Sequence, residues 1–349
     1  MRLNWRAVCL MTVAITGLVP VGAAAAAPAG ASTAHGATGC VIVTATIPVG
    51  RVPQLAAVNP ATNTVYVTNF GASTVSVING QTNTVTATIR VGPAGSEPYG
   101  VAVNPATNTA YVATLSKVSV ISGQTNTVTA TIHVGRLPQG VAVNPATNAI
   151  YAANLGFPHH VAVINGQTNK VTTTIPVTRG LGAVAVNPAT NTIYVTNDST
   201  VTVINGRTNT VTTTIHTGRV PDQVAVNPKT NTIYVTRGDA VSVINGRTNT
   251  VTATIHGSGG PFGVAVDPTT NTIYVANNYV NTVSIINGQT NAVTATIHVG
   301  TSPVGVAVDP VTHTAYVVNS SAPRAVMPGQ RYLSSPPARD EHTRPSSPA

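Results

Sequence analysis

The sequence is poor in charged side chains. Asp, Glu, Lys and Arg together make up 7% of the 349 residues, where about a quarter is usual. The formal net charge is +9, but the basic residues are scattered and no run of five occurs. This pattern is only a weak indication of nucleic-acid binding and is typical of a solvated surface. The chain does not have a disordered composition either, because Val, Ile and Tyr recur at regular intervals.

Cysteine is nearly absent. The chain has two cysteines, Cys9 and Cys40, and Cys9 lies in a segment that we expect to be removed. One remaining thiol cannot crosslink the fold, which excludes a disulfide-based scaffold. The stretch "ATGC" at 37–40 is a poor match to a lipoprotein box, so we expect Cys40 to be a free thiol or to bridge two chains.

Long apolar runs are missing, apart from one at the N-terminus. Arg2 and Arg6 precede an apolar stretch from Ala7 to Val21, and an alanine run follows. This order is that of a secretory signal peptide, and the stretch is short for a membrane span. We predict a signal peptide and cleavage zone over 1–31 and a short linker over 32–40. The protein is therefore expected to be secreted, either extracellular or associated with the cell envelope.

Signatures of common enzymes are missing too. The sequence contains no G-x-S-x-G, no phosphate loop, no C-x-x-C-H and no H-E-x-x-H. Acidic residues are few, and Asp267 and Asp309 take the place of an asparagine in a repeated turn. The remaining candidates for acid–base chemistry are Glu97, Asp198, Asp222 and Asp239, and nothing in their spacing forces two of them together.

One phrase occurs seven times. "NPATNTVYVTN" at 59–69 has close copies that begin 45, 40, 43, 40, 40 and 42 residues apart. A period near 40 with several short strands in each unit is typical of a β-propeller.

The unit from Pro221 to Gly257 shows the parts of one repeat. The runs "DQVAV", "TIYVT", "AVSVI" and "TVTATIH" are rich in β-branched residues, and each has the length of a strand. "NPKTN" joins the first two runs and "NGRTN" joins the last two, and both have the composition of tight turns. Each unit is therefore expected to be a four-stranded antiparallel sheet that hides its apolar faces against its neighbours.

These units predict an all-β fold over residues 41–330, a seven-bladed β-propeller of four-stranded antiparallel blades. The seventh copy has a weak third strand, since "APRAVMPGQ" stands where other copies have "STVSVINGQ", and no fourth strand follows. "VTATIPVG" at 43–50 is an unpaired fourth strand, so we expect the N-terminal strand to complete the last blade. Residues 331–349 are rich in Pro and Ser and are predicted to be a disordered tail.

The same residues carry a family resemblance. "IYVTN" followed by "VTVINGRTNTVTTTIHTG" resembles the 40-residue YVTN β-propeller repeat, and the resemblance covers residues 41–330. Proteins of this family are typically exported or cell-surface proteins of bacteria and archaea, surface-layer proteins among them. The resemblance implies a role at the surface or in binding, and it implies no particular chemistry.

Histidines could suggest a metal site. His133, His216, His256 and His298 follow "TI" in the fourth strand of four repeats. With strands about 4.8 Å apart, equivalent outer positions on neighbouring blades are roughly 18 Å apart, too far to share an ion. His159 and His160 are a single pair and supply too few ligands. We therefore expect no metal and no cofactor.

The variable loops are the expected working surface, because the "NPxTN" and "NGxTN" turns hardly differ between copies. Loops that lead into the first strands lie nearest the axis. An arginine ring there could grip a carboxylate, phosphate or sulfate, or the arginines could simply be solvated. The candidate ligand-binding residues are Arg51, Gln54, Tyr99, Arg136, Gln139, Arg179, Arg219, Asp222 and Phe262.

We therefore expect a non-catalytic binding or interaction module at the cell envelope. Its expected partner is a protein, a glycan or an anionic envelope polymer, and nucleic acid is not expected because stacking aromatics are few. The alternative is a propeller enzyme, a lyase or hydrolase, with its site at the mouth of the channel.

Overall fold

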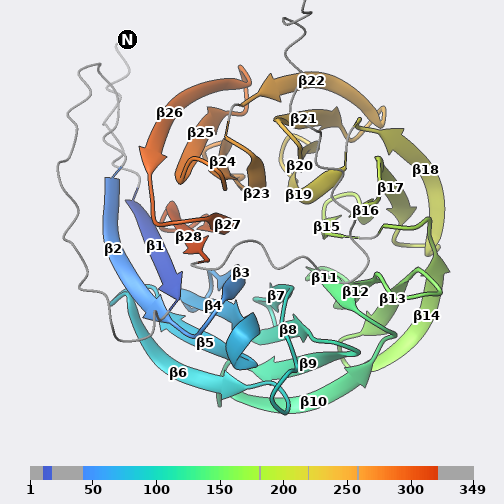
Figure 1. Cartoon of the computed structure of the whole chain (residues 1–349). Helices are drawn as coiled ribbons and strands as arrows, with labels where there is room; N and C mark the ends of the chain where they lie inside the picture. The colour runs from blue at the N-terminus through green and yellow to red at the C-terminus, as the bar shows by residue number, and fades with distance from the viewer. Residues whose placement is uncertain (1–10, 18–41, 181, 219, 258, 321–349) are drawn as a thin grey trace, which may run out of the picture.

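Seven four-stranded sheets surround a central axis (Figure 1). The computed structural model describes residues 11–17, 42–180, 182–218, 220–257 and 259–320. Arg219, Cys40, the predicted linker over 32–40 and the predicted tail over 331–349 lie outside the described residues. In every sheet the first strand of the repeat is innermost, and the last strand forms the rim (Figure 1).

Six sheets are blades of four consecutive antiparallel strands. Blade 1 consists of β3 (Pro53–Asn59), β4 (Thr64–Asn69), β5 (Thr74–Asn79) and β6 (Thr84–Arg90), with a 3-10 turn, η1 (Phe70–Ala72), after β4. Blade 2 consists of β7 (Val101–Asn104), β8 (Thr109–Ala113), β9 (Lys117–Ser122) and β10 (Thr127–His133). Blade 3 consists of β11 (Pro138–Asn144), β12 (Ala149–Asn154), β13 (His160–Asn165) and β14 (Lys170–Pro176).

The next three blades repeat this order. Blade 4 consists of β15 (Val184–Asn187), β16 (Thr192–Thr196), β17 (Thr200–Asn205) and β18 (Thr210–His216). Blade 5 consists of β19 (Pro221–Asn227), β20 (Thr232–Arg237), β21 (Ala240–Asn245) and β22 (Thr250–His256). Blade 6 consists of β23 (Pro261–Asp267), β24 (Thr272–Asn277), β25 (Thr282–Asn287) and β26 (Ala292–His298).

The remaining sheet corrects the prediction of seven antiparallel blades. It contains β27 (Pro303–Asp309), β28 (Thr314–Asn319), β1 (Met11–Gly17) and β2 (Ile42–Val49), in the spatial order β2-β1-β28-β27. β27 and β28 are antiparallel, but β1 runs parallel to both β28 and β2. The propeller therefore has six blades of four antiparallel strands, not seven, and we call the remaining sheet the mixed sheet.

The last repeat explains why this sheet is mixed. Its expected third strand contained Pro323 and Arg324, and residues from 321 onward lie outside the described part of the chain. β1 occupies the place beside β28 instead, which covers an edge that would otherwise expose unpaired backbone groups. β2 does lie at the rim and runs in the direction of a fourth strand, but its partner is β1, from the segment predicted as a signal peptide.

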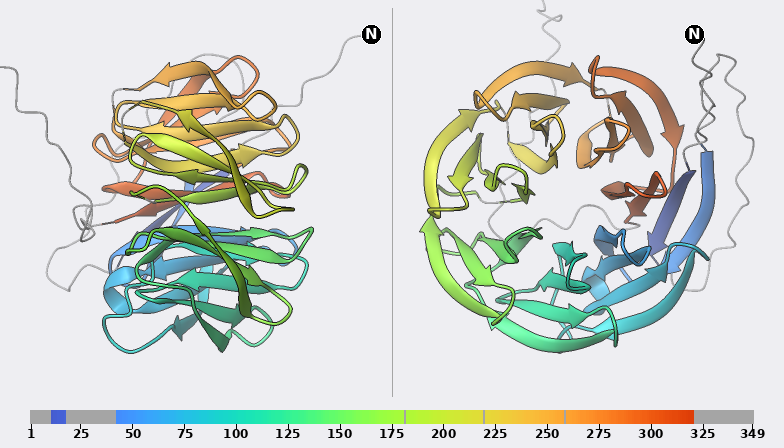
Figure 2. Two further views of the ribbon diagram at one scale, coloured as in Figure 1. Left: turned by 90° about the vertical axis from the view of Figure 1, so that its right-hand side faces the viewer. Right: turned by 180° about the vertical axis from the view of Figure 1, so that it is seen from behind.

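The ring closes between the ends of the repeat region. Successive innermost strands contact each other all the way round, and β27 contacts β3. Ile47 and Val49 of β2 share a buried cluster with Val65 and Ile78 of blade 1 and Tyr316 of β28. Figure 2 shows the mixed sheet between blade 6 (orange) and blade 1 (blue to cyan). In this position β2 lies beside blade 1, which follows it in the sequence.

The two asparagines of an "NGxTN" turn each stabilise the shape of the turn. In "NGQTN", the Asn79 side-chain oxygen accepts hydrogen bonds from the backbone N–H groups of Gln81 (2.8 Å) and Thr82 (3.1 Å). The last asparagine of the turn, Asn83, has a φ of 55°, and Asn tolerates this left-handed conformation better than most residues. The repeated letters thus specify the turn that joins the two outer strands.

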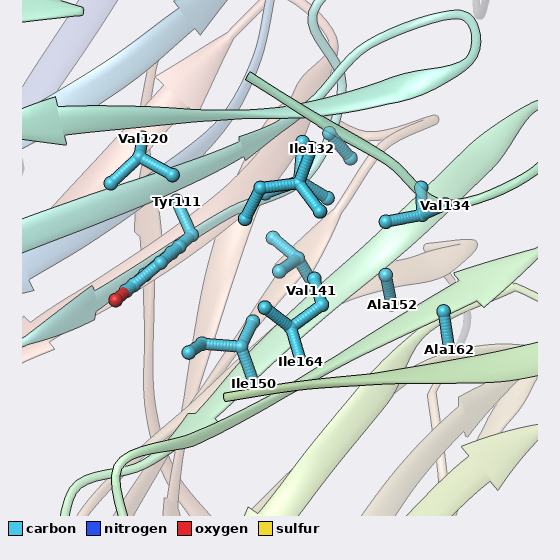
Figure 3. Close-up of a cluster of buried hydrophobic side chains, with 11 residues drawn as sticks. Tyr111, Val120, Ile132, Val134, Val141, Ile150, Ala152, Ala162 and Ile164 are labelled. Carbon is cyan, nitrogen blue, oxygen red and sulfur yellow. The ribbon is translucent and has the colours of Figure 1, made fainter. Parts of the chain in front are cut away.

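The tyrosine of each repeat fills the seam to the next sheet. Tyr66 of β4 is 1% exposed and packs with Val101, Ala110 and Ile121 of blade 2. Its hydroxyl lies 2.7 Å from where a Cβ on Gly123 would be, so the glycine of the "ISGQTN" turn makes room for it. Figure 3 shows the equivalent cluster around Tyr111, between blades 2 and 3. Each blade thus supplies half of the core that its neighbour needs.

The asparagine that opens each "NPxTN" turn links successive blades. The Asn59 side-chain amide donates to Asn108 Oδ1 of the next blade at 2.8 Å. The same bond recurs from Asn104, Asn144, Asn187 and Asn227 to Asn148, Asn191, Asn231 and Asn271, at 2.7 to 2.8 Å. Because the donors are fully buried, the repeated-turn side of the ring is fixed by packing and hydrogen bonding.

Candidate functional site

The two ends of the propeller differ in how much their loops vary from repeat to repeat. The "NPxTN"-type and "NGxTN"-type turns form one end, which we call the repeated-turn face. The opposite end, the variable-loop face, carries the loops between second and third strands and the loops that lead into each next first strand. These two kinds of loop pair with each other: Leu155 N donates to Leu137 O at 3.0 Å, and Asn278 N donates to Gly260 O at 2.9 Å.

A constrained backbone starts most first strands on this face. The residue before the proline that opens these repeats has a positive φ at Val52 (50°), Glu97 (47°), Leu137 (52°) and Ser302 (50°). Residues before proline normally avoid helical conformations of either hand, and a positive φ is costly for a residue with a side chain. Backbone bonds such as Phe70 N to Val52 O (2.9 Å) and Leu155 N to Leu137 O (3.0 Å) hold this backbone conformation at equivalent places around the ring.

The predicted arginines lie at the surface of the variable-loop face. Arg51, Arg136 and Arg179 are exposed, and no ion pair involves them among the described residues. Arg219 is outside the described residues. The separations of these arginines depend on flexible side chains, so a shared anion site stays a prediction.

The other predicted residues lie deeper. Gln54 and Gln139 are 5% and 4% exposed, and Phe262 is 5% exposed. Tyr99 and Asp222 are half-buried. The backbone oxygens of Tyr99, Asp222 and Phe262 accept hydrogen bonds from threonine hydroxyls of the preceding blade, Thr68 (2.7 Å), Thr196 (3.4 Å) and Thr236 (2.6 Å). The backbone at Tyr99, Asp222 and Phe262 therefore helps to join neighbouring blades. A role of these residues in binding stays a prediction.

A hollow lies between the loops of blades 2 and 3. It is small, with room for about one water molecule (about 10 Å³), and it opens to solvent; its lining residues are Glu97, Thr114, Leu115, Leu137, Pro138 and Gln139. The loops are tied together by hydrogen bonds from Leu115 N to Ser96 O (3.2 Å) and from Leu137 N to Leu115 O (2.7 Å). These bonds fix the loops relative to one another, so the shape of the hollow is defined by the fold.

Two polar groups in this hollow lack partners among the described residues. Gln139 Nε2 is buried and has no hydrogen-bond partner in the described part of the chain. Glu97 is half-buried and forms no ion pair with any described residue. A buried donor without an acceptor is costly unless water or a ligand satisfies it, so the pair marks the hollow as a candidate binding site.

The threonine link between blades is not present at every seam. Blades 2, 3 and 6 carry Ala113, Ala153 and Ala276 where blades 1, 4 and 5 carry Thr68, Thr196 and Thr236, so the threonine bond to the backbone oxygen of the next blade is missing at Gln139. Sequence reasoning singled out Gln139 as a mouth residue and Glu97 only as a potential acid. It missed Thr114, Leu115 and Leu137, and the alanine at 113 does not mark this seam, because Ala153 and Ala276 occupy the same position in blades 3 and 6.

The acidic candidates for catalysis do not converge. Asp198 lies in the loop between β16 and β17, Asp222 on β19, and Asp239 between β20 and β21, where its carboxylate is 4.0 Å from the Arg237 guanidinium. Glu97 lies in another blade, before β7. The structure thus brings no acid–base pair together among the described candidates.

The histidines of the repeat lie on different blades. His133, His216, His256 and His298 are exposed at the ends of four different rim strands. The two ring nitrogens of His160 lie 2.7 Å from Pro158 O and 2.9 Å from Val134 O. Among the described residues, no three His, Cys, Asp or Glu side chains are grouped so that they could hold a metal ion.

Comparison with known proteins bears on the fold. The solved structure of hydrazine synthase from Kuenenia stuttgartiensis is similar, with a TM-score of 0.68 at 19% sequence identity, over 78% of this chain and 96% of that chain. The fold is a β-propeller. No family model matches the sequence, and no match was found among curated proteins. At this identity the likeness to hydrazine synthase concerns the propeller alone and does not extend to its activity. The propeller prediction is confirmed, and membership of the YVTN family stays a prediction.

No described helix is both long enough and apolar enough to be a transmembrane span.

Proposed function

We propose that this propeller is an exported, non-catalytic binding module of the YVTN type, which holds a cell-envelope ligand on its variable-loop face. The N-terminal pattern of basic, apolar and small residues supports export. Cleavage within 1–31 would remove β1 (Met11–Gly17) from the mixed sheet, so the exported chain would correspond to the shortened chain that begins at residue 32. The repeat supports the family. The single observation that carries the binding role is the contrast between the two ends of the ring.

That contrast is chemical. Leu115, Phe157, Val220, Tyr279 and Val280 are large apolar side chains exposed by 41 to 84% in loops of the variable-loop face, whereas Val311 is the one described on a repeated turn. Three exposed arginines accompany them. Exposed apolar side chains beside basic ones are typical of recognition surfaces. On the repeated-turn face, by contrast, the asparagine side chains form hydrogen bonds between blades.

The arginines give this face its proposed charge preference. Arg51, Arg136 and Arg179 occupy the loops that lead into first strands, nearest the axis. Guanidinium groups bind carboxylates, phosphates and sulfates through paired N–H donors. An anionic polymer of the envelope would therefore be held by several weak contacts that salt screens.

The test compares two triple variants of equal charge change. Arg51, Arg136 and Arg179 are changed together to Ala on the variable-loop face. Exposed Arg207, Lys229 and Arg247 are changed together to Ala on the repeated-turn face. Sedimentation with isolated envelope material measures binding at low and high salt, and thermal melting checks the fold.

We expect the first triple variant to lose binding by tenfold or more and the second to bind as the unchanged chain does. High salt should weaken binding of the unchanged chain. Equal loss in both variants would mean that only net charge matters, and undiminished binding by the first would remove the arginines from the site.

A further inference from the structure

His160 opens the third strand of blade 3, and its ring lies between two carbonyl groups. Nδ1 lies 2.7 Å from Pro158 O, and Nε2 lies 2.9 Å from Val134 O. Pro158 belongs to the loop at 155–159, which joins β12 to β13, and Val134 begins the connection at 134–137, which leads from blade 2 to blade 3. The imidazole therefore links this loop to the connection between the two blades.

Both contacts need a donor from the ring, because a carbonyl oxygen only accepts hydrogen bonds. A neutral imidazole carries one N–H, so either neutral tautomer leaves a ring lone pair facing a carbonyl oxygen at one of the two contacts. An imidazolium carries an N–H on each nitrogen and donates to both. The geometry around His160 is therefore that of the protonated side chain.

The backbone beside the ring leaves room for it in this position. A Cβ on Gly135 would lie 2.8 Å from His160 Cε1, too close for an ordinary contact. The other five antiparallel blades open their third strands with Thr74, Lys117, Thr200, Ala240 and Thr282. In the described part of the chain, none of those five side chains bonds a carbonyl of the preceding connection, so the link through His160 is specific to blade 3.

No acidic side chain accounts for a charge on this ring. The segments around it are β9, β10, β12, β13, β14, the loop at 155–159 and the connections at 134–137 and 177–180, and none of them contains Asp or Glu. Their charged or titratable side chains at this end of the blades are Lys117, His133, Arg136, His159 and Arg179. Arg136 and Arg179 are exposed, so solvent screens their repulsion, and the two carbonyl oxygens are the groups that favour the imidazolium.

Loss of one proton from the imidazolium must release one of the two carbonyls. The contact with Pro158 O is exposed, whereas the contact with Val134 O is partly buried. Water can replace the ring at an exposed carbonyl, but a buried carbonyl without a donor is costly. The neutral ring therefore keeps its proton on Nε2 and releases Pro158. Since proline has no N–H, this carbonyl is the only backbone group through which Pro158 can be held by a hydrogen bond.

We propose that His160 is a pH-dependent clasp: the protonated ring holds the loop at 155–159 against the connection between blades 2 and 3, and the neutral ring frees the middle of that loop. The loop carries Phe157, which is 84% exposed on the variable-loop face. Histidine ordinarily changes charge between about pH 5 and about pH 8, so the clasp is closed at the acidic end of this range and open at the alkaline end. The proposal does not rest on the proposed binding function, and its test needs no ligand.

The experiment measures amide hydrogen exchange in the full chain at the two ends of this pH range, relative to the intrinsic exchange rate at each pH. Gly156 N donates to Arg136 O at 3.0 Å, and Val177 N donates to His159 O at 3.4 Å. These two amides lie on either side of the segment that the clasp holds, so their protection reports whether it is held.

Blade 6 provides a control within the same molecule. Its equivalent amides, Tyr279 N and Val299 N, form backbone hydrogen bonds of 3.0 and 2.9 Å. Thr282 stands there in place of His160. Any general effect of pH on these loops will therefore appear in both blades, and an effect of the clasp will appear in blade 3 alone.

Three variants identify the group that responds. His160→Thr brings the residue of blade 6 into blade 3, and His133→Thr and His159→Asn remove the neighbouring rings. From the acidic to the alkaline end, we expect the protection of the Gly156 and Val177 amides to fall about tenfold in the unchanged chain, as for the loss of one hydrogen bond to a charged group. The same fall should occur in His133→Thr and in His159→Asn, and no fall should occur in blade 6 or in His160→Thr.

Long-range proton–nitrogen spectra of the imidazoles test the clasp without a substitution, in case His160→Thr does not fold. At the acidic end both ring protons of His160 should exchange slowly with water, unlike those of the exposed His133, and at the alkaline end the Nε2 proton should remain. Absence of a protected Nδ1 proton at the acidic end would overturn the proposal. An equal loss of amide protection in blades 3 and 6, a fall that persists in His160→Thr, or a fall that His159→Asn abolishes would overturn it as well.

Discussion

Asp267 Oδ2 lies 2.7 Å from His313 Nδ1, across the seam between blade 6 and the mixed sheet. Five other seams join an asparagine to an asparagine at the same two positions. Here the donor amide has become a carboxylate, which only accepts, and the accepting amide has become a ring that can donate. The two departures from the repeat therefore compensate each other.

The first prediction concerns this pair. His313→Ala leaves Oδ2 of the fully buried Asp267 without its donor, while Oδ1 keeps its bond from Thr269 N, and we expect the change to lower the free energy of unfolding by about 2 kcal/mol. Asp267→Asn combined with His313→Asn rebuilds the pair found elsewhere and should stay close to the unchanged chain. Denaturant titrations measure both, and a double variant as unstable as His313→Ala would contradict the compensation.

The second prediction concerns the closing seam. The equivalent positions there are Asp309 and Asn63, and Asp309 Oδ2 and Asn63 Oδ1 are both buried without a partner in the described part of the chain. Asp309→Asn provides a donor, so we expect it to raise the unfolding free energy by about 1 kcal/mol. Asn227→Asp creates the same mismatch at an intact seam and should lower it by a similar amount. Changes of the same sign in the two variants would contradict this explanation.

The third prediction concerns alkaline stability. Burial raises the pKa of Tyr194 to about 12, and burial with the nearby Asp309 charge raises the pKa of Tyr316 to about 12. Burial also raises the pKa of Tyr66, Tyr111, Tyr151 and Tyr234. The folded state binds these protons more tightly than the unfolded state, so their contribution is complete below pH 10 and is lost as the pH rises from about 10 to about 12.

Tyr194→Phe isolates one member of this set. The Tyr194 hydroxyl has no hydrogen-bond partner among the described residues, so the change should be nearly neutral at pH 7. At pH 11 the variant should gain on the order of 1 kcal/mol relative to the unchanged chain, because one buried phenol no longer ionises on unfolding. Phenolate absorbance and circular dichroism, followed together, measure the transition. A smaller phenolate signal near pH 10 in folded Tyr194→Phe than in the folded unchanged chain would contradict the burial of Tyr194, since exposed Tyr279 contributes equally to both.

The fourth prediction concerns β1. This strand pairs with β28 and with β2, so a chain that begins at residue 32 leaves both of these edges without it. We expect that chain to melt several degrees lower than the full chain, with faster hydrogen exchange in β28 and β2 and little change in blades 3 to 5. A shortened chain with unchanged exchange in β28 and β2 would show that β1 does not stabilise the mixed sheet.

The repeat made most of the fold readable from sequence. "NPATN" and "NGQTN" encode turns through Asn59 and Asn79, and the tyrosine at 66 encodes a seam, so each unit predicts its own blade and its contact with the next. The mixed sheet could not be predicted in this way. Its partner for β28 comes from residues 11–17, which carry no repeat pattern and were interpreted as part of a leader.

The candidate site was predictable only as a region. The variable loops could be assigned to one face because strand order requires it, and Gln139 could be placed near the axis. The hollow could not be foreseen, because it depends on how Glu97, Leu115 and Leu137 from separate loops approach one another, and on whether a buried amide finds an acceptor. These features depend on distances between blades, and the sequence of a single repeat does not determine them.

The central claim is that one end of the ring joins the blades and the other end binds. Hydrogen exchange of the full chain with and without bound envelope material tests it most directly. The account predicts slower exchange for the amides of the loops at 95–99, 114–117, 135–139 and 155–160 when the ligand is bound, and unchanged exchange in the turns at 60–63 and 80–83. Protection confined to those turns, with the variable loops unaffected in a protein shown to be bound, would contradict it.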